Sequence, residues 1–405
     1  MQYANLAPQR RALILAGVSA AAFIGPFSQT VYTPSLVEIG HGFGVDALRV
    51  NLTISLFVAI LALSGFIVGP LADRKGRRAT LLPGLALFVL GSVVCLMAQQ
   101  YGPFLFGRAL QAAGISTGVA MAAIVIGDLY PPEERAGAMS LYQLVTLLGP
   151  VVGPVVGGFI ANHLHWQAAF TLLAVLGTAV LAYNALLLPE TRPATLHQAA
   201  DQSSATQVLA NPSARAIFAV AFCQFYGYYT FLVFLPVLLG DLFQLPPAQR
   251  GLAFVPLTAG LLIGSSAVKV RAQQWRRTQI VNVASYVAAG TVLAVWALLA
   301  LHQLTLPVLM ALMLVYGLFV GGSLPSQTTI LVNLFGASRG RAVGLYNTVR
   351  FSGAAAGPLA AAAVAAQFGQ PAVFLVLGLG LGAAALVIRR HLSDPYEIHA
   401  AATPL

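Results

Sequence analysis

Charge is the scarcest feature of this sequence. Only 8% of its 405 residues are Asp, Glu, Lys or Arg, whereas soluble domains carry about 25%. Hydrophobic residues make up 58% of the chain, and the mean hydropathy is +0.83. This composition excludes a soluble globular protein and predicts a polytopic membrane protein. About 20 apolar residues cross a bilayer as a helix, so the length allows roughly twelve spans with short loops.

Acids, histidines and cysteines are too few and too scattered to form a catalytic or metal site. None of the acids or histidines falls in the centre of an expected span. The sequence has no His, Cys and acid cluster at metal-ligand spacing, and no glycine loop ending in Lys-Ser/Thr that would bind ATP. We therefore expect no enzyme activity, no metal and no cofactor. Cys95 and Cys223 lie in apolar runs and are predicted to pack rather than to form a disulfide.

The basic residues are arranged as in a membrane protein rather than a nucleic-acid-binding one. The net charge is +10, but the bases fall in short loops between apolar runs. These runs predict helices at 12–36, 47–71, 79–98, 103–127, 136–160, 166–188, 214–239, 250–268, 278–300, 305–332, 340–365 and 371–388. Of the 21 Lys and Arg residues, 17 then lie on one side, 2 on the other, and Arg108 and Arg350 inside spans. Because positive loops collect in the cytoplasm, we expect both termini there.

The most charged stretch is residues 69–78, GPLADRKGRR, between the second and third expected spans. Such a cluster cannot lie in hydrocarbon, so we expect a tight loop at the membrane surface in which the glycines allow a sharp turn. An ordinary positive loop would explain the bases, but not Asp73 or the spaced glycines.

This decapeptide closely resembles the loop between helices 2 and 3 of the major facilitator superfamily, whose pattern is roughly G-x-x-x-D-R-x-G-R-[RK]. The resemblance implies an all-α membrane protein with twelve transmembrane helices in two six-helix bundles related by a pseudo-twofold axis. It also implies a gating role for Gly69, Asp73, Arg74, Gly76, Arg77 and Arg78.

An internal repeat supports this architecture. At an offset of 204 residues, eight of the twenty positions from Arg135 to Pro154 are identical to those from Arg339 to Pro358. The second copy of the decapeptide is degraded, with Ala272 where Asp73 would stand. We predict a six-helix bundle at 1–189, a flexible or partly helical cytoplasmic linker at 190–212, and a second bundle at 213–405, with substrate bound near the midplane between the halves.

The fourth span contains Arg108 and Gln111, which resemble the superfamily's helix-4 pattern R-x-x-Q-G. An intramembrane Arg costs at least about 2.5 kcal/mol on insertion scales and usually faces a cavity or a partner. The resemblance links this Arg to proton movement or substrate contact; a structural Arg bonded to helix carbonyls is the alternative. Asp128 ends this span and, by resemblance, helps latch the cytoplasmic face, with Arg77 or Arg78 as the expected partner. A loop acid at the water surface is the alternative.

The fifth span contains the stretch GPVVGPVVGG at 149–158. Glycines spaced by four let a neighbouring helix approach closely, and the prolines bend the helix. The stretch resembles the G-x-x-x-G-P-x-x-G-G element associated with exporters and antiporters of the superfamily. It implies a gating or coupling role for Gly149, Gly153, Pro154 and Gly157, with plain small-residue packing as the alternative.

Polar and aromatic residues deep in the spans predict a substrate-binding cavity, although helix packing explains each of them equally well. The candidates are Gln29, Tyr32, Tyr142, Gln143, Gln224, Tyr228, Tyr229, Gln327, Tyr346, Asn347 and Arg350. Arg350 lies nine residues past Arg341, or roughly 13 Å deep at 1.5 Å per residue. It replaces Thr146 of the first copy, so the fold does not require it. A deep cation attracts anionic groups or Tyr rings.

The chain is similar to the twelve-helix drug–proton antiporter branch, which implies an inner-membrane, multi-pass exporter of small amphipathic or aromatic compounds. Many members keep a carboxylate in helix 1, and residues 23–32 have none. Neutral or anionic substrates are therefore favoured over cationic ones. We expect alternating access, protons as the coupling ion, a lipid bilayer as surroundings, a monomer and no nucleic acid. An importer or facilitator of a nutrient or organic anion is the alternative; a receptor or scaffold would need a long soluble extension.

Overall fold

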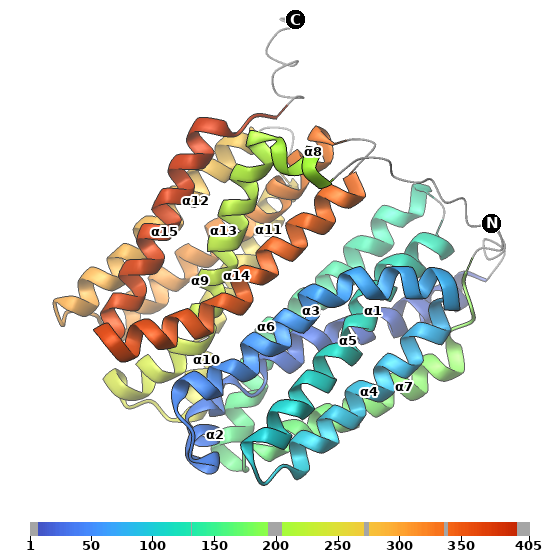
Figure 1. The fold of residues 1–405 in the computed structure, drawn as a ribbon, viewed down its shortest axis with the longest axis horizontal. Helices are drawn as coiled ribbons and strands as arrows, with labels where there is room; N and C mark the ends of the chain where they lie inside the picture. The colour runs from blue at the N-terminus through green and yellow to red at the C-terminus, as the bar shows by residue number, and fades with distance from the viewer. Residues whose placement is uncertain (1–6, 131, 193–204, 271–274, 336–338, 395–405) are drawn as a thin grey trace, which may run out of the picture. The chain divides into compact units, whose positions relative to one another are not determined.

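The computed structural model describes residues 7–130, 132–192, 205–270, 275–335 and 339–394. These described residues form helices and no strand (Figure 1). Twelve helices are long and apolar enough to cross a membrane, which confirms the expected number of spans. The all-helical architecture follows from the solvent, because hydrocarbon offers no partner to an unpaired backbone group.

The chain forms two compact units. The first contains residues 1–198 and Leu235–Leu252, and the second contains Ala199–Phe234 and 253–405. The segment Leu235–Leu252 thus groups with the first unit, although the sequence places it in the second half. The bundle boundaries at 189 and 213 stay a prediction, and much of the expected linker lies outside the described residues.

In the first unit, α1 packs against α5, α6 and α7, and α4 packs against α5 and α7 (Figure 1). At one end of its core, the Phe104 ring lies 5.2 Å from the rings of both Phe43 and Phe170. The elements are α1 (Pro8–Thr30), a 3-10 turn (Thr33–Ser35), α2 (Leu36–Phe43), α3 (Ala47–Lys75), α4 (Arg77–Met97), α5 (Tyr101–Leu129), α6 (Pro132–His163), α7 (Gln167–Leu187) and α10 (Pro247–Leu252).

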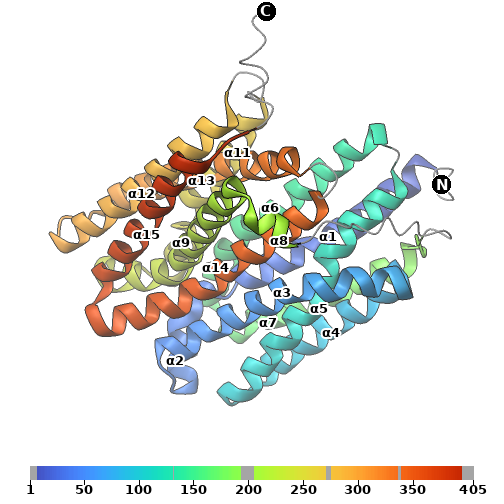
Figure 2. The same ribbon diagram turned by 45° about the horizontal axis from the view of Figure 1, so that its top comes forward.

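In the second unit, α12 packs against α13 and α15, and α11 packs closely on α13. Both views show α12 and α15 side by side (Figure 1, Figure 2). The elements are α8 (Ala205–Ala210), α9 (Pro212–Phe243, whose end groups with the first unit), α11 (Val255–Val270), α12 (Arg277–Ala300), α13 (Leu306–Leu334), α14 (Arg339–Phe368) and α15 (Gln370–His391).

Two expected spans are broken rather than continuous. The first span was predicted at 12–36, but α1 ends at Thr30 and the chain passes through the turn Thr33–Ser35 before α2. Pro34 explains the break, because proline lacks an N–H and disfavours helix at the preceding residue. The eighth span, predicted at 250–268, is divided between α10 and α11, and Pro256 occupies the first turn of α11, where proline is tolerated.

Candidate functional site

The decapeptide is helix rather than loop, which corrects the sequence-based expectation. Helix α3 continues through Asp73 to Lys75, and α4 begins at Arg77, so only Gly76 makes the turn. Gly76 has φ 103°, which favours glycine. Gly69 lies inside α3, where an added Cβ would meet open space, so the turn does not use it. The chain reverses within one residue because both helices extend to the corner.

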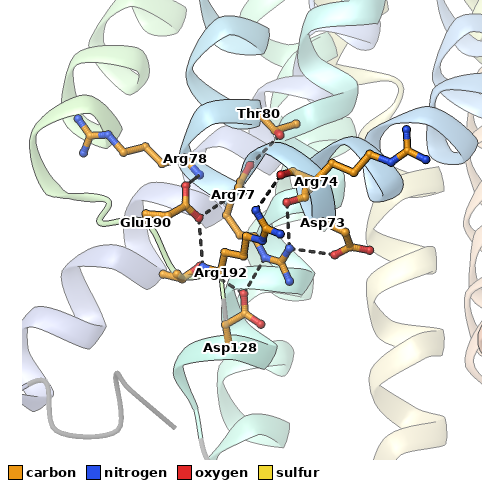
Figure 3. A network of polar contacts seen from close by, with 11 residues as sticks. Asp73, Arg74, Arg77, Arg78, Thr80, Asp128, Glu190 and Arg192 are labelled. Carbon is orange, nitrogen blue, oxygen red and sulfur yellow. Dashed lines mark hydrogen bonds and ion pairs between the residues drawn. The ribbon is translucent and has the colours of Figure 1, made fainter. Parts of the chain in front are cut away.

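Arg77 is the centre of a charge cluster that we define as Asp73, Arg77, Asp128 and Glu190 (Figure 3). Its Nε donates to Asp128 Oδ2 at 2.9 Å, and its Nη1 donates to Asp73 Oδ1 at 2.9 Å and to the Ala72 carbonyl at 3.0 Å. The Arg77 side chain is 5% exposed and that of Asp128 is 13% exposed. The partner expected for Asp128 is therefore present, and the guanidinium joins the ends of α3 and α5 to the start of α4.

Glu190, which the sequence reasoning placed in the linker, completes the cluster. Its carboxylate accepts from the backbone N–H groups of Arg77 at 2.7 Å and Arg78 at 3.2 Å. It thus caps the N-terminus of α4, where backbone donors lack partners and the helix dipole favours an anion. A Cβ on Gly76 would collide with this carboxylate. Gly76 is therefore required twice, by its backbone angle and by the acid packed against it.

The other arginines of this region bind carbonyl groups or point outward. Arg78 donates to the carbonyls of Leu188 and Ala185, which ties α4 to the end of α7. Arg192 Nη1 donates to the carbonyl of Arg74 at 2.8 Å. Figure 3 shows the side chain of Arg74 extending away from the cluster, and this residue is exposed.

Arg108 is fully buried between two aromatic rings. Its Cζ lies 4.4 Å from the ring centroids of both Tyr32 and Phe57. Nη1 donates to Gln111 Oε1 at 2.6 Å, and Gln111 donates to Ser92 at 2.7 Å. Nε and Nη2 are buried and have no hydrogen-bond acceptor among the described residues. Arg108 and Gln111 are therefore hydrogen-bonded to each other, and the guanidinium contacts aromatic rings rather than a carboxylate.

The glycines of α6 lie against the backbone of α1, and we call Gly149, Gly153 and Gly157 the glycine seam. A Cβ on Gly149 would meet Phe27 N and the Pro26 side chain, one on Gly153 would meet Thr30 Oγ1, and one on Gly157 would meet the Val31 carbonyl. Thr30 Oγ1 also donates to the Gly149 carbonyl at 3.3 Å. The close helix approach predicted from the spacing is thus present, with α1 as the neighbour. Pro154 lies inside α6, and its carbonyl contacts Gly251 of α10 within the first unit.

Three predicted substrate residues of the second unit bind one another in a buried polar core. Gln327 Nε2 donates to Gln224 Oε1 at 2.8 Å and to Ser323 Oγ at 2.7 Å, and the Tyr346 hydroxyl donates to Gln327 Oε1 at 3.2 Å. Both glutamines are 0% exposed and Tyr346 is 1% exposed. This network joins α9, α13 and α14 and satisfies polar groups that would be costly to bury alone.

Arg350 lies beside this polar core and is surrounded by rings. Its Cζ is 4.8 Å from the centroids of Phe225 and Phe351, and 5.5 Å from that of Tyr346. No ion pair to Arg350 is present within the described residues, and its Nε is buried without an acceptor. It is partly exposed. A cation in this setting can accept an anionic or electron-rich partner.

The remaining predicted substrate residues differ in burial. Tyr32 is fully buried and its hydroxyl lies 3.1 Å from Thr53 Oγ1, while Gln29 is 5% exposed. The rings of Tyr228 and Tyr229 contact each other at 5.6 Å. Tyr142 and Asn347 are partly buried and Gln143 is exposed. Substrate contact by these residues stays a prediction. Among the described residues there is no group of His, Cys, Asp and Glu that could hold a metal, and both cysteines are free.

Comparison with known proteins gives consistent family evidence. The family model described as the Major Facilitator Superfamily matches residues 18–302 and 283–404. The multidrug resistance protein MdtL of Escherichia coli O81 (strain ED1a) is 33% identical over 175 residues, which are 43% of this chain and 45% of that protein. The MFS-type transporter phiD of Fungal sp. (strain ATCC 74256) is 31% identical over 182 residues, 45% of this chain and 28% of that protein. The matches thus span less than half the length of these curated relatives.

Solved structures resemble the whole chain. The crystal structure of a D-xylose–proton symporter matches with a TM-score of 0.80 and 16% identity, over 95% of this chain and 98% of that one. A bacterial homologue of the human lysosomal transporter Spinster matches with a TM-score of 0.79 and 17% identity, over 95% and 97%. At these identities the likeness shows the fold alone. With the family model matched along nearly its whole length, and with twelve apolar helices in the fold of these transporters, the chain belongs to the Major Facilitator Superfamily.

Proposed function

We propose that this transporter exports small amphipathic or aromatic compounds by alternating access, in antiport with protons. The observation that carries the direction of transport is the glycine seam, because its sequence element is associated with exporters of the superfamily and its glycines pack on α1. The similarity to multidrug resistance proteins supports the same direction. Both termini lie in the cytoplasm and the protein works as a monomer in the inner membrane.

Arg350 and its rings are the proposed substrate contact. Phe225 and Phe351 offer flat apolar surfaces to an aromatic compound, while the guanidinium offers charge or hydrogen bonds to its polar end. The repeat-related residue, Thr146, uses its hydroxyl on the Tyr142 carbonyl of its own helix. The fold can therefore be built without an arginine here, which supports a role in binding. This site favours neutral or anionic compounds over cations.

Proton coupling needs a titratable group, and the acids lie at the ends of the helices. Asp128 in the charge cluster is one candidate, and Glu38 is the other. The Glu38 carboxylate lies 3.9 Å from Arg250 Nη1 within the first unit. In the alternative function, an importer or facilitator of an organic anion, Arg350 would bind the same chemical group, and uptake rather than extrusion by intact cells would identify it.

Transport by the purified protein in proteoliposomes tests this proposal. A panel of neutral, anionic and cationic aromatic compounds is supplied, and a pH-sensitive dye records proton movement that depends on the compound. We expect signals with neutral or anionic members and opposite flows of compound and proton. Compound and proton moving in the same direction would contradict antiport.

Variants of Arg350 then test the site. Arg350→Ala is expected to weaken binding of an active compound at least tenfold, whereas Arg350→Lys keeps part of it because Lys retains the charge but not the planar guanidinium. Arg341→Ala, on the exposed face of the same helix, is the matched control. If wild type and Arg350→Ala bind the compound equally, Arg350 is not part of the site.

A further inference from the structure

Each unit has an apolar groove on its surface between three helices. The groove of the first unit has a volume of about 490 Å³ and lies between α3, α4 and α5. The groove of the second unit has a volume of about 360 Å³ and lies between α11, α12 and α13. Neither contains a residue of the charge cluster, of the glycine seam or of the polar core around Gln327. The grooves are therefore separate from the candidate sites described above.

The two grooves occupy equivalent places in the repeat. Eight residues that line the first groove have a counterpart 200 positions later that lines the second. In the first groove these are residues 64, 67, 68, 75, 79, 80, 83 and 84. On the third helix the offset is 205, which pairs Ala113 with Leu318 and Thr117 with Gly322. The two units thus have a groove at the same place although few of the lining residues are identical. This recurrence indicates that the groove arises from the packing of the helices in each unit rather than from one particular set of side chains.

The walls of the grooves suit a hydrocarbon chain. Leu63 and Ile67 are 62% and 66% exposed in the first groove, and Val283 is 51% exposed in the second. Along α3 the first groove extends from Ile60 to Lys75, or about 22 Å at 1.5 Å per residue. A single leaflet is about 15 Å of hydrocarbon, half of the roughly 30 Å core. One acyl chain of the adjoining leaflet therefore fits along the groove.

A cation lies at the loop end of each groove. Lys75 is the last residue of α3 and Arg276 directly precedes α12, and both are exposed. Within the described ranges neither has an ion-pair partner, whereas their neighbours Arg77 and Arg277 both do. Trp275 lines the second groove at the same end, and tryptophan is enriched at the headgroup level of membranes. Basic pockets between membrane helices bind anionic lipid head groups.

We propose that each groove binds one anionic phospholipid. An acyl chain lies along the apolar walls, and the phosphate group pairs with Lys75 in the first unit and with Arg276 in the second. This proposal does not depend on the substrate or on the direction of transport.

Native mass spectrometry of the full-length protein tests the proposal. The protein is purified in a neutral detergent and titrated with phosphatidylglycerol, or with phosphatidylcholine of the same acyl chains. We expect two tightly bound phosphatidylglycerol molecules and weaker phosphatidylcholine binding. Equal binding of the two lipids would overturn the headgroup assignment. Glycerol phosphate, which lacks acyl chains, is expected not to compete; competition at equal concentration would overturn the groove assignment.

Variants assign each lipid to its groove. Lys75→Gln and Arg276→Gln should each weaken one of the two sites about fivefold, the effect expected for one basic residue near an anionic surface. Ala79→Trp and Ala267→Trp keep the cations but fill the grooves, and each should remove one bound lipid. Arg74→Gln and Arg390→Gln, which are exposed bases that do not line a groove, are the matched controls. Retention of both tight sites in the Lys75→Gln, Arg276→Gln double variant would refute the proposal.

Discussion

In each unit an arginine at the start of a helix contacts an acid that follows another helix. The arginine begins α4 and the acid follows α7 in the first unit, and the arginine begins α12 and the acid follows α15 in the second. The backbone N–H of Arg77 donates to Glu190 at 2.7 Å in the first unit, and the Arg277 guanidinium lies 3.4 Å from Asp394 in the second. A third residue, near the end of a third helix, contacts each pair, and its type differs between the units. Helices α5 and α13 both have 29 residues, and the residue before their last is Asp128 in one and Asn333 in the other.

This difference distinguishes the acid that both units share from the acids that are present in the first unit alone. Asn333 donates to both oxygens of Asp394, at 3.1 and 3.3 Å, so one acid with an amide closes the second corner. In the first corner Asp73 and Asp128 bind the guanidinium of Arg77, which is 5% exposed against 32% for Arg277, and Glu190 binds the backbone. We infer that the shared acid stabilises the bundle, whereas Asp73 and Asp128 serve the gating proposed for the first unit.

The largest effect is expected from Arg77→Ala. This variant leaves Asp128 without its ion-pair partner, and breaking a buried pair costs on the order of 3 kcal/mol. Arg277→Ala removes a longer pair whose arginine is 32% exposed, and the buried Asp394 keeps its hydrogen bonds from Asn333, so the cost should be smaller, about 1 kcal/mol. Thermal unfolding in detergent, followed by circular dichroism, compares the two variants. Equal destabilisation would show that the two corners depend on their arginines to the same degree.

Gly76→Ala is expected to come next, at about 2 kcal/mol, because a strained backbone conformation costs on the order of 1–3 kcal/mol and the new Cβ displaces Glu190. The equivalent residue 200 positions later is Arg276, whose φ is −69°. Arg276→Ala should therefore leave the unfolding temperature almost unchanged. If Gly76→Ala behaves in the same way, the one-residue turn is not a constraint.

Asn333→Asp makes the second corner resemble the first and should destabilise it by about 1 kcal/mol at neutral pH, because the new carboxylate faces Asp394. Acidification should reduce the loss, since one carboxyl of the pair then takes a proton. Unfolding temperatures across a pH series measure this. Asn211→Asp, where the side-chain oxygen accepts from Ala214 N at a helix start, is the control and should cost little. A loss independent of pH would argue against charge repulsion.

Asp73→Asn should have the smallest effect on stability, below about 0.5 kcal/mol, because the Asp73 side chain is 54% exposed. We nevertheless expect transport to fall several-fold at normal expression, since Arg77 loses one of its two acids. Uptake into proteoliposomes per mole of protein measures this. Unchanged transport would remove Asp73 from the proposed gating and leave Asp128 and Glu190 as the partners that matter.

The number of spans and the family could be predicted because both depend on residue types that can be recognised in the sequence. Apolar runs separated by charged residues mark the spans, and the decapeptide at 69–78 marks the family. The breaks at Pro34 and before Pro256 were missed, since proline also occurs inside intact spans such as α6. The helical state of Asp73 to Lys75 was missed because charge suggested a loop, whereas a helix can extend beyond the hydrocarbon.

The partners of the site residues were harder to predict. Glu190 was assigned to a linker, although the repeat contained a signal: the offset of 204 that pairs Arg135 with Arg339 also pairs Glu190 with Asp394. Gln224 and Gln327 suit a cavity or a buried network equally well by residue type. Only their mutual hydrogen bonds distinguish the two.

The glycine seam has a consequence for how such a transporter can change during evolution. A Cβ on Gly157 would meet the main chain of Val31, whereas one on Gly149 would also meet the Pro26 side chain and one on Gly153 would meet Thr30 Oγ1. Every residue type has a main-chain carbonyl, so the contact at Gly157 does not depend on which residue stands at position 31, whereas the contacts at Gly149 and Gly153 depend on Pro26 and Thr30. Substitutions at position 31 can therefore accumulate without changing how closely the two helices approach, whereas larger side chains at positions 26 and 30 would push them apart.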